Sequence, residues 1–255
     1  MLKDNPFSNG EQGLMRIKET TIQKQYKGYL NTPTLWNLKL DSLEQFKMSN
    51  HTDVDFINDG SINQRLGKVI EQFVFHELRQ QPSISILVKN IQISKQKITI
   101  GEIDCLFQRD KEYIHLEIIY KFYLYDPSVG TTELDKWIGP NKKDSFVKKL
   151  TKLKSKQLPI LFRPETVSTL LKFNLDPLNF NQLVYFKAQL FVPLQRLDDT
   201  YPLINNACIK GFYIQMDQLQ RFGNCHFYIP SKMDWLIDTH TDVDWLDFDQ
   251  FHNVV

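Results

Sequence analysis

GEIDCLF at residues 101–107 and HLEIIYKFYL at residues 115–124 are two strand-forming segments that carry charged side chains. Alternate residues of an extended strand point to opposite faces. One face of the second segment is apolar or aromatic and predicts a buried surface: Ile114, Leu116, Ile118, Tyr120, Phe122 and Leu124. The opposite face carries the charged groups of the segment: His115, Glu117, Ile119, Lys121 and Tyr123.

The charged residues of the two segments are expected to meet. Glu102 and Asp104 share one face of the first segment and point away from Ile103. Two neighbouring strands would then offer three carboxylates and the ammonium of Lys121 to one cleft. This combination suggests hydrolytic chemistry around a divalent cation, because carboxylate oxygens are ligands for such ions.

The surrounding periodicity predicts alternating helices and strands. A core-facing helix begins after Ser61 and ends before Pro82, with Glu71 at the edge of its apolar stripe. The short polar turns between the next three segments predict an antiparallel meander. The predicted elements are strands at 83–93, 97–107 and 113–124, helices at 144–156 and 164–172, a strand at 183–194, and strands with a short helix (216–222) after residue 209.

Two further segments carry less regular patterns. Residues 26–48 suggest short helices broken at Thr32-Pro33 and at Asp41-Ser42. Residues 234–249 are rich in aspartate and contain no lysine or arginine. We expect a mobile segment at 1–25, one domain at 26–237 and an acidic tail at 238–255. A further hypothesis is that the acidic residues 234–249 fold over the lysine-rich helix at 144–156 and compete with nucleic acid.

Composition restricts the class of protein. The chain has 255 residues, a net charge of +1 and three widely spaced cysteines, so neither a disulfide framework nor a thiolate zinc site is expected. No segment reaches the length of a membrane helix, and a cytoplasmic location is expected. Motifs for ATP hydrolysis, dinucleotide binding or serine-hydrolase chemistry are missing, so no nucleotide cofactor is expected.

The order of helix, three strands, basic helix and strand resembles the PD-(D/E)XK nucleases. In that superfamily an acid from the first helix, an aspartate on the second strand and an acid-x-lysine on the third gather around magnesium, and Glu71, Asp104 and Lys121 match those places. The segments RLGKVIEQF (65–73), GEIDCLF, HLEIIYKFYL and WIGPNKKDSFVKKL (137–150) resemble a bacterial family catalogued as a domain of unknown function, DUF1853, which is placed with that superfamily.

One residue departs from the superfamily pattern. Ile119 stands where an acid is expected, and Glu117 lies two residues earlier on the same face. The carboxylate is therefore displaced by almost 7 Å along the strand, at roughly 3.3 Å per residue.

The resemblance implies a restriction-endonuclease-like α/β fold, a mixed central sheet flanked by helices with an N-terminal helical extension. It implies a Mg²⁺- or Mn²⁺-dependent phosphodiesterase acting on DNA or RNA, in which Asp104, Glu117 and Lys121 are catalytic. The expected metal ligands are Asp104, Glu117, Glu71 and Glu102. The expected contacts to nucleic acid come from Asn141, Lys142, Lys143, Lys148, Lys149 and Lys152.

Several of these residues also have a purely structural interpretation. Glu117 and Lys121 fit the water-exposed polar face of an antiparallel strand, and Glu71 fits a solvated helix edge. The lysine-rich helix fits an ordinary amphipathic surface. The alternative function is a catalytically inactive nuclease-like scaffold that binds nucleic acid or a protein partner, and Ile119 favours it.

Overall fold

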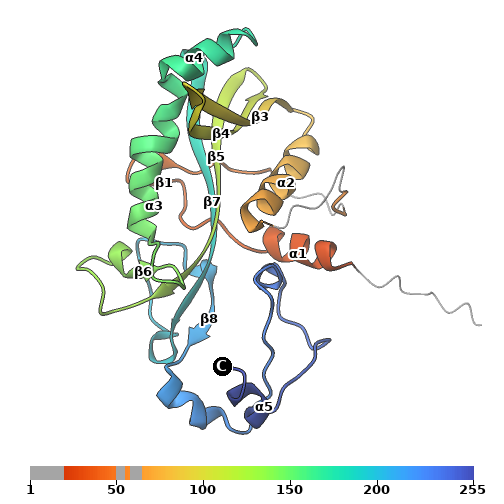
Figure 1. Cartoon of the computed structure of the whole chain (residues 1–255), viewed down its shortest axis with the longest axis vertical. Coiled ribbons are helices and arrows are strands. Elements are labelled where there is room, and N and C mark those ends of the chain that lie inside the picture. Colours follow the sequence, from red (N-terminus) through yellow and green to blue (C-terminus); the bar gives the residue numbers. More distant parts are fainter. Residues whose placement is uncertain (1–19, 50–54, 58–64) are drawn as a thin grey trace, which may run out of the picture.

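The computed structural model describes residues 20–49, 55–57 and 65–255, and a mixed six-stranded sheet forms its centre (Figure 1). Five strands are hydrogen-bonded in a row, and the sixth pairs with the edge of one of them. In spatial order the row is β3 (Ile84–Lys95), β4 (Ile98–Arg109), β5 (Glu112–Tyr125), β7 (Phe180–Pro193) and β8 (Ile209–Tyr213), while β6 (Trp137–Ile138) pairs with β5.

The first three long strands form the predicted antiparallel meander. β3 pairs with β4 and β4 with β5, both antiparallel. Tight turns make these connections: Gln96 and Lys97 have positive φ angles at the first turn, as Asp110 does at the second. β7 and β8 then add in parallel beside β5, which requires the long helical crossover between β5 and β7.

Helices cover both faces of the sheet (Figure 1). α1 (Thr21–Leu30) and α2 (Leu66–Arg79) lie on one side, and α3 (Phe146–Lys152) and α4 (Pro164–Leu171) on the other. On β5, Leu116 belongs to the core beneath α1 and α2, whereas Ile119 belongs to the core beneath α3. The predicted mixed sheet with flanking helices is confirmed.

Much of the polar face of β5 is buried. The side chains of His115 and Glu117 are fully buried, so the interpretation of Glu117 as a water-exposed residue is wrong, whereas the side chain of Lys121 is about one-third exposed. The reason is the parallel pairing with β7, since parallel strands occur where helices cover both faces of a sheet.

The lysine-rich helix is shorter than predicted and changes its winding. Ser145 caps α3 by accepting a hydrogen bond from the backbone N–H of Lys148. After Lys152 the chain continues as a π-helix, Leu153–Gln157, and then as a 3₁₀-helix, Leu158–Phe162. Pro159 has no backbone N–H to donate, which prevents a regular α-helix from continuing through this point.

The N-terminal part differs from the predicted series of short helices. α1 begins at Thr21, inside the segment expected to be mobile, while residues 1–19 lie outside the described residues. Instead of a second helix the chain forms a short hairpin of β1 (Lys39–Leu40) and β2 (Leu43–Glu44). Asp41 and Ser42 at its turn have positive φ angles, which a helix does not allow. The backbone N–H of Phe46 then bonds to the carbonyl of Val184 in β7, at 2.7 Å.

The start of the predicted helix at Ser61 also lies outside the described residues, and α2 is described from Leu66 to Arg79. The predicted helix at 164–172 is confirmed by α4, and the short helix at 216–222 is present as 3₁₀-helix. The predicted strand near Phe227 is reduced to one bridge with Leu246.

The acidic C-terminal segment packs against α1 and β8, so the expectation that it covers the lysine-rich helix is wrong. Leu236 is fully buried. Asp238 accepts hydrogen bonds from Asn31 after α1, at 2.7 Å, and from Lys210 of β8, at 3.4 Å. The segment ends with a short helix, α5 (Phe248–His252).

Candidate metal centre

The sheet opens between β4 and β5 at the acidic residues. β4 is paired with β3 as far as Ile98 at its start, but its pairing with β5 begins only at Cys105, opposite Leu116. At the opening, Oδ2 of Asp104 accepts a hydrogen bond of 2.9 Å from the backbone N–H of Ile118. A side chain thus satisfies a backbone donor of β5 at the position where ladder pairing stops.

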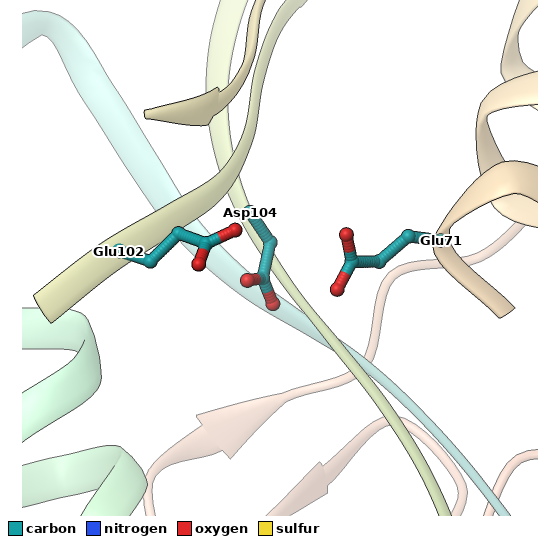
Figure 2. A group of neighbouring side chains, drawn as sticks. All are labelled: Glu71, Glu102 and Asp104. Atoms are coloured by element: carbon teal, nitrogen blue, oxygen red, sulfur yellow. The ribbon is translucent and has the colours of Figure 1, made fainter. Parts of the chain in front are cut away.

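Three carboxylates meet at this opening. Glu71 reaches in from α2, while Glu102 and Asp104 come from β4 (Figure 2). One oxygen of each lies within 4.8 Å of the others, and this is the single group of this kind in the described part of the chain. Glu102 and Asp104 share a face, as the alternation in the sequence predicts. We call Glu71, Glu102 and Asp104 the carboxylate cluster.

A lysine lies against the carboxylate cluster. Nζ of Lys68 donates hydrogen bonds to Glu71, at 2.7 Å, and to Glu102, at 2.5 Å. Although burial would lower it, the pKa of Lys68 is raised, because these two bonds favour the charged ammonium. Lys68 therefore neutralises part of the charge of the cluster.

Glu117 is not one of the three clustered acids. Its Oε2 accepts a hydrogen bond of 2.5 Å from Nε2 of Gln157. Its Oε1 lies 3.3 Å from Nε2 of His115, but neither of these two buried atoms has a hydrogen-bond partner. Glu117 lies on the α3 side of β5, close enough for its charge to act on Asp104.

The buried acids hold their protons more tightly than exposed ones. Burial, followed by the negative charge of Glu117, raises the pKa of Asp104 to about 7. Burial also raises the pKa of Glu71 to about 7, against the hydrogen bond from Lys68, and that of Glu117 to about 7. The ionised cluster therefore lacks positive charge, which a bound cation would supply.

The spacing of the three clustered oxygens is compatible with one divalent cation. Oxygens bound to one Mg²⁺ at about 2.1 Å are at most about 4.2 Å apart, slightly less than the 4.8 Å limit of the cluster. Oxygens bound to a larger ion such as Ca²⁺, with bonds of about 2.4 Å, can be up to about 4.8 Å apart. The all-oxygen donor set is the type that Mg²⁺, Mn²⁺ and Ca²⁺ prefer.

The lysines expected to act at the site occupy different environments. Nζ of Lys121 lies 2.6 Å from Oδ2 of Asp144, and both side chains are about one-third exposed, 34% and 37%. Lys149 is half-buried and bonds to Oε1 of Gln157 at 2.6 Å. The remaining residues expected to contact nucleic acid are exposed: Asn141, Lys142, Lys143, Lys148 and Lys152.

Sequence reasoning did not assign a role to Lys68, Asp144 or Gln157. For Lys68 a signal was present, because it lies three residues before Glu71 and so on the same side of a helix. Gln157 carried no comparable signal, since the π-helix that precedes Leu158 has no recognised pattern in this sequence.

Without divalent cations, we expect stability to fall as the pH rises from about 4 to about 7. The pKa values of Glu71, Asp104 and Glu117 are about 7 in the folded protein, above their ordinary values of 4.5, 3.8 and 4.5. The folded state therefore binds more protons in this range, and stability that is present below the lower values is lost as the acids ionise.

One buried group opposes this trend. Burial lowers the pKa of His115 to about 4. The contribution of His115 to stability is therefore present above the ordinary pKa of histidine, 6.5, and is lost as the pH falls. Because three acids with raised pKa values oppose one histidine, the net result is a loss of stability as the pH rises. Melting temperatures measured across this range in a chelator test the expectation. A melting temperature that climbs steadily up to pH 7 would contradict it.

Comparisons with known proteins identify the family of the chain. No helix in the described part of the chain is long and apolar enough to cross a membrane. No curated protein and no solved structure matched the chain. The family model described as "Domain of unknown function (DUF1853)" matches residues 12–255. With nearly all of its length matched, the chain belongs to the DUF1853 family.

Proposed function

We propose that this protein is a metal-dependent phosphodiesterase that cleaves DNA or RNA and has a restriction-endonuclease-like fold. The observation that carries the proposal is the carboxylate cluster, whose oxygens meet within 4.8 Å at the opening between β4 and β5. Two of its carboxylates, Glu71 and Asp104, have raised pKa values. Perturbed carboxylates gathered in an opening of a sheet are typical of functional sites.

Glu71, Glu102 and Asp104 would hold one Mg²⁺ or Mn²⁺, with the charge of Glu117 beside them. When bound, such an ion lowers the pKa of a water molecule and neutralises the phosphate. The residues of the chain fix where these groups lie. Asp104 is held by the backbone of Ile118, at 2.9 Å, and Glu71 and Glu102 by Lys68.

The exposed lysines near the start of α3 would hold the substrate. Lys142, Lys143 and Lys148 are exposed, as is Lys152 at the end of the helix. Contacts of lysines to the phosphate backbone give salt-dependent binding with little reading of base sequence. Asn141 lies in the loop before α3, where its Oδ1 accepts the backbone N–H of Lys143 at 3.1 Å.

The proposed reaction is hydrolysis of a phosphodiester. A bond forms between the oxygen of water and phosphorus, and one P–O ester bond breaks. One proton of the water ends on the leaving oxygen, so the products are a phosphomonoester and a free hydroxyl group. No oxidant, reductant or nucleotide is required.

The alternative is a nuclease-like scaffold without catalysis, and Lys68 favours it. Its ammonium already binds two of the three clustered carboxylates, at 2.7 and 2.5 Å, and so provides positive charge that a metal would otherwise bring. Ile119, where an acid would be expected, packs into the core beneath α3. A scaffold of this kind would bind nucleic acid or a protein through its exposed lysines.

Metal binding and cleavage by the parent protein distinguish the two functions. We expect calorimetric titration with Mn²⁺ or Mg²⁺ to show binding at one site. End-labelled single- and double-stranded DNA and RNA should be cut with Mn²⁺ and remain intact in a chelator. Metal binding without cleavage of any of these substrates would contradict the phosphodiesterase, and absence of metal binding would favour the scaffold.

A further inference from the structure

Lys121, the lysine expected to be catalytic, is paired with another carboxylate. Its ammonium lies 2.6 Å from the carboxylate of Asp144, just before α3. This pair joins β5 to the start of the helix. The positive charge of Lys121 is therefore partly neutralised by Asp144.

Lys149 lies on the buried side of α3 instead. Its Nζ donates to Oε1 of Gln157 at 2.6 Å, and Nε2 of the same amide donates to Oε2 of Glu117 at 2.5 Å. One glutamine side chain thus links the ammonium to the buried carboxylate on β5. The two bonds use opposite ends of the amide, so they fix its orientation as well as the position of Lys149.

The positive charge of Lys149 acts on both central acids. Burial raises the pKa of Asp104 and of Glu117, and among the positive charges that oppose it Lys149 contributes most to both. Burial in turn lowers the pKa of Lys149 to about 8, against the charge of Glu117. An ammonium held in such surroundings acts more strongly than one in water, because the local dielectric constant is low.

Two unsatisfied buried atoms mark the same place. Oε1 of Glu117 and Nε2 of His115 are fully buried, lie 3.3 Å apart and lack hydrogen-bond partners among the described residues. Leaving such groups unpaired is costly, so each instance requires an explanation. Gln157 ends a π-helix, a rare conformation that occurs frequently at functional sites.

We infer that Lys149, oriented by Gln157, is the catalytic ammonium of this site and contacts the phosphate, whereas Lys121 serves as the structural partner of Asp144. This inference rests on the proposed phosphodiesterase function and adds a residue to it. The ammonium donates hydrogen bonds to a non-bridging phosphate oxygen and transfers no proton. It stabilises the negative charge that grows on that oxygen in the transition state.

The test compares three single lysine variants of the full-length protein on DNA and RNA substrates with Mn²⁺. We expect Lys149→Ala to lower the rate of cleavage roughly 100-fold while Mn²⁺ affinity, measured by calorimetry, is retained. Lys121→Ala should lower the rate less than Lys149→Ala does. Lys156→Ala is the matched control, because it removes the same charge from an exposed position in the π-helix.

Chemical rescue separates a catalytic role from a structural one. Ethylamine added to Lys149→Ala should restore part of the cleavage rate, because its ammonium can occupy the space left by the side chain. Lys149→Met, which keeps most of the hydrocarbon chain, replaces Lys149→Ala if the alanine variant does not fold. Gln157→Leu tests the positioning role: kcat should fall about tenfold with KM little changed.

The outcomes are distinguishable. A larger loss in Lys121→Ala than in Lys149→Ala, or a lack of rescue by ethylamine, overturns the assignment of Lys149 and leaves the proposed function intact. A parent protein that neither binds Mn²⁺ nor cleaves any of these substrates overturns both.

Discussion

Replacing Asp104 by asparagine is expected to weaken Mn²⁺ binding about 100-fold and to reduce cleavage roughly 100- to 1,000-fold. Asp104 is the central member of the carboxylate cluster, between Glu71 and Glu102 (Figure 2). Asparagine has nearly the same shape, and its carbonyl oxygen can still accept the backbone N–H of Ile118. The variant therefore removes the charge and preserves the hydrogen bond that holds β5 at the opening.

The same variant should be more stable than the parent in the absence of metal. Burial raises the pKa of Asp104 to about 7, so at higher pH the folded parent contains an ionised group that burial disfavours. The amide of the substituted asparagine is neutral at every pH, so the melting temperature of the variant in a chelator should be higher than that of the parent. Mn²⁺ should raise the melting temperature of the parent more than that of Asp104→Asn.

Asp110→Asn is the matched control. Asp110 is an exposed residue in the turn between β4 and β5, with a positive φ angle that asparagine tolerates well. Metal affinity, cleavage and stability should all remain near the parent values. Unchanged Mn²⁺ affinity in Asp104→Asn would mean that the Asp104 carboxylate is not a ligand.

Gly28→Ala is expected to destabilise the protein by about 3 kcal/mol. A Cβ atom on this glycine of α1 would overlap the backbone carbonyl oxygen of Leu236 and would lie 3.1 Å from the backbone nitrogen of Asp238. Both obstacles are backbone atoms, so the C-terminal segment must move away from α1. The melting temperature should fall by roughly 6–12 °C, at about 2–4 °C per kcal/mol for a domain of this size.

Gly67→Ala provides the opposite result as a control. Gly67 also lies in a helix, α2, but a Cβ atom there meets no described atom within 4 Å. Alanine should therefore stabilise the protein by about 0.5–1 kcal/mol, because glycine is unfavourable within a helix. Equal stability of the two alanine variants by chemical denaturation would show that α1 and the C-terminal segment are not packed as described.

Alternation along the strands was sufficient to predict much of the site. It placed Glu102 and Asp104 on one face of β4, and the structure brings both into the carboxylate cluster. It also separated Glu117 and Ile119 from the face that contains Leu116. These predictions succeed because the side-chain period of a strand is fixed by its backbone.

The burial and the hydrogen-bond partners of these residues could not be predicted from alternation. Glu117 is buried because β7, residues 180–193, pairs in parallel beside β5 and helices cover both faces. The strand assignment was correct, but its partner is distant in sequence, and periodicity does not identify partners. Likewise, the bond from Gln157 to Glu117 depends on a π-helix that no periodic pattern predicted.

The prediction for the N-terminal part of the domain was wrong for a local reason. Residues 39–44 form a hairpin, whereas short helices with a break at Asp41-Ser42 were predicted, because three neighbouring residues, Leu38, Asp41 and Ser42, adopt positive φ angles. Leucine and serine are not residues that favour positive φ angles, so Leu38 and Ser42 do not indicate this conformation in the sequence. The hairpin is stabilised by its contact with β7 through Gln45 and Phe46, again a partner that is remote along the chain.

The parallel register of β5 and β7 also determines the order in which the chain can assemble. Twelve residue pairs join the two strands, from Tyr113 opposite Phe180 to Leu124 opposite Phe191. During synthesis, β5 leaves the ribosome well before β7. Residues 126–179 must be synthesised before the second edge of β5 can pair with β7. Contacts this distant slow folding, and an unpaired apolar strand is prone to association with other chains. Newly made protein therefore exposes an unpaired edge of β5 until β7 has been synthesised.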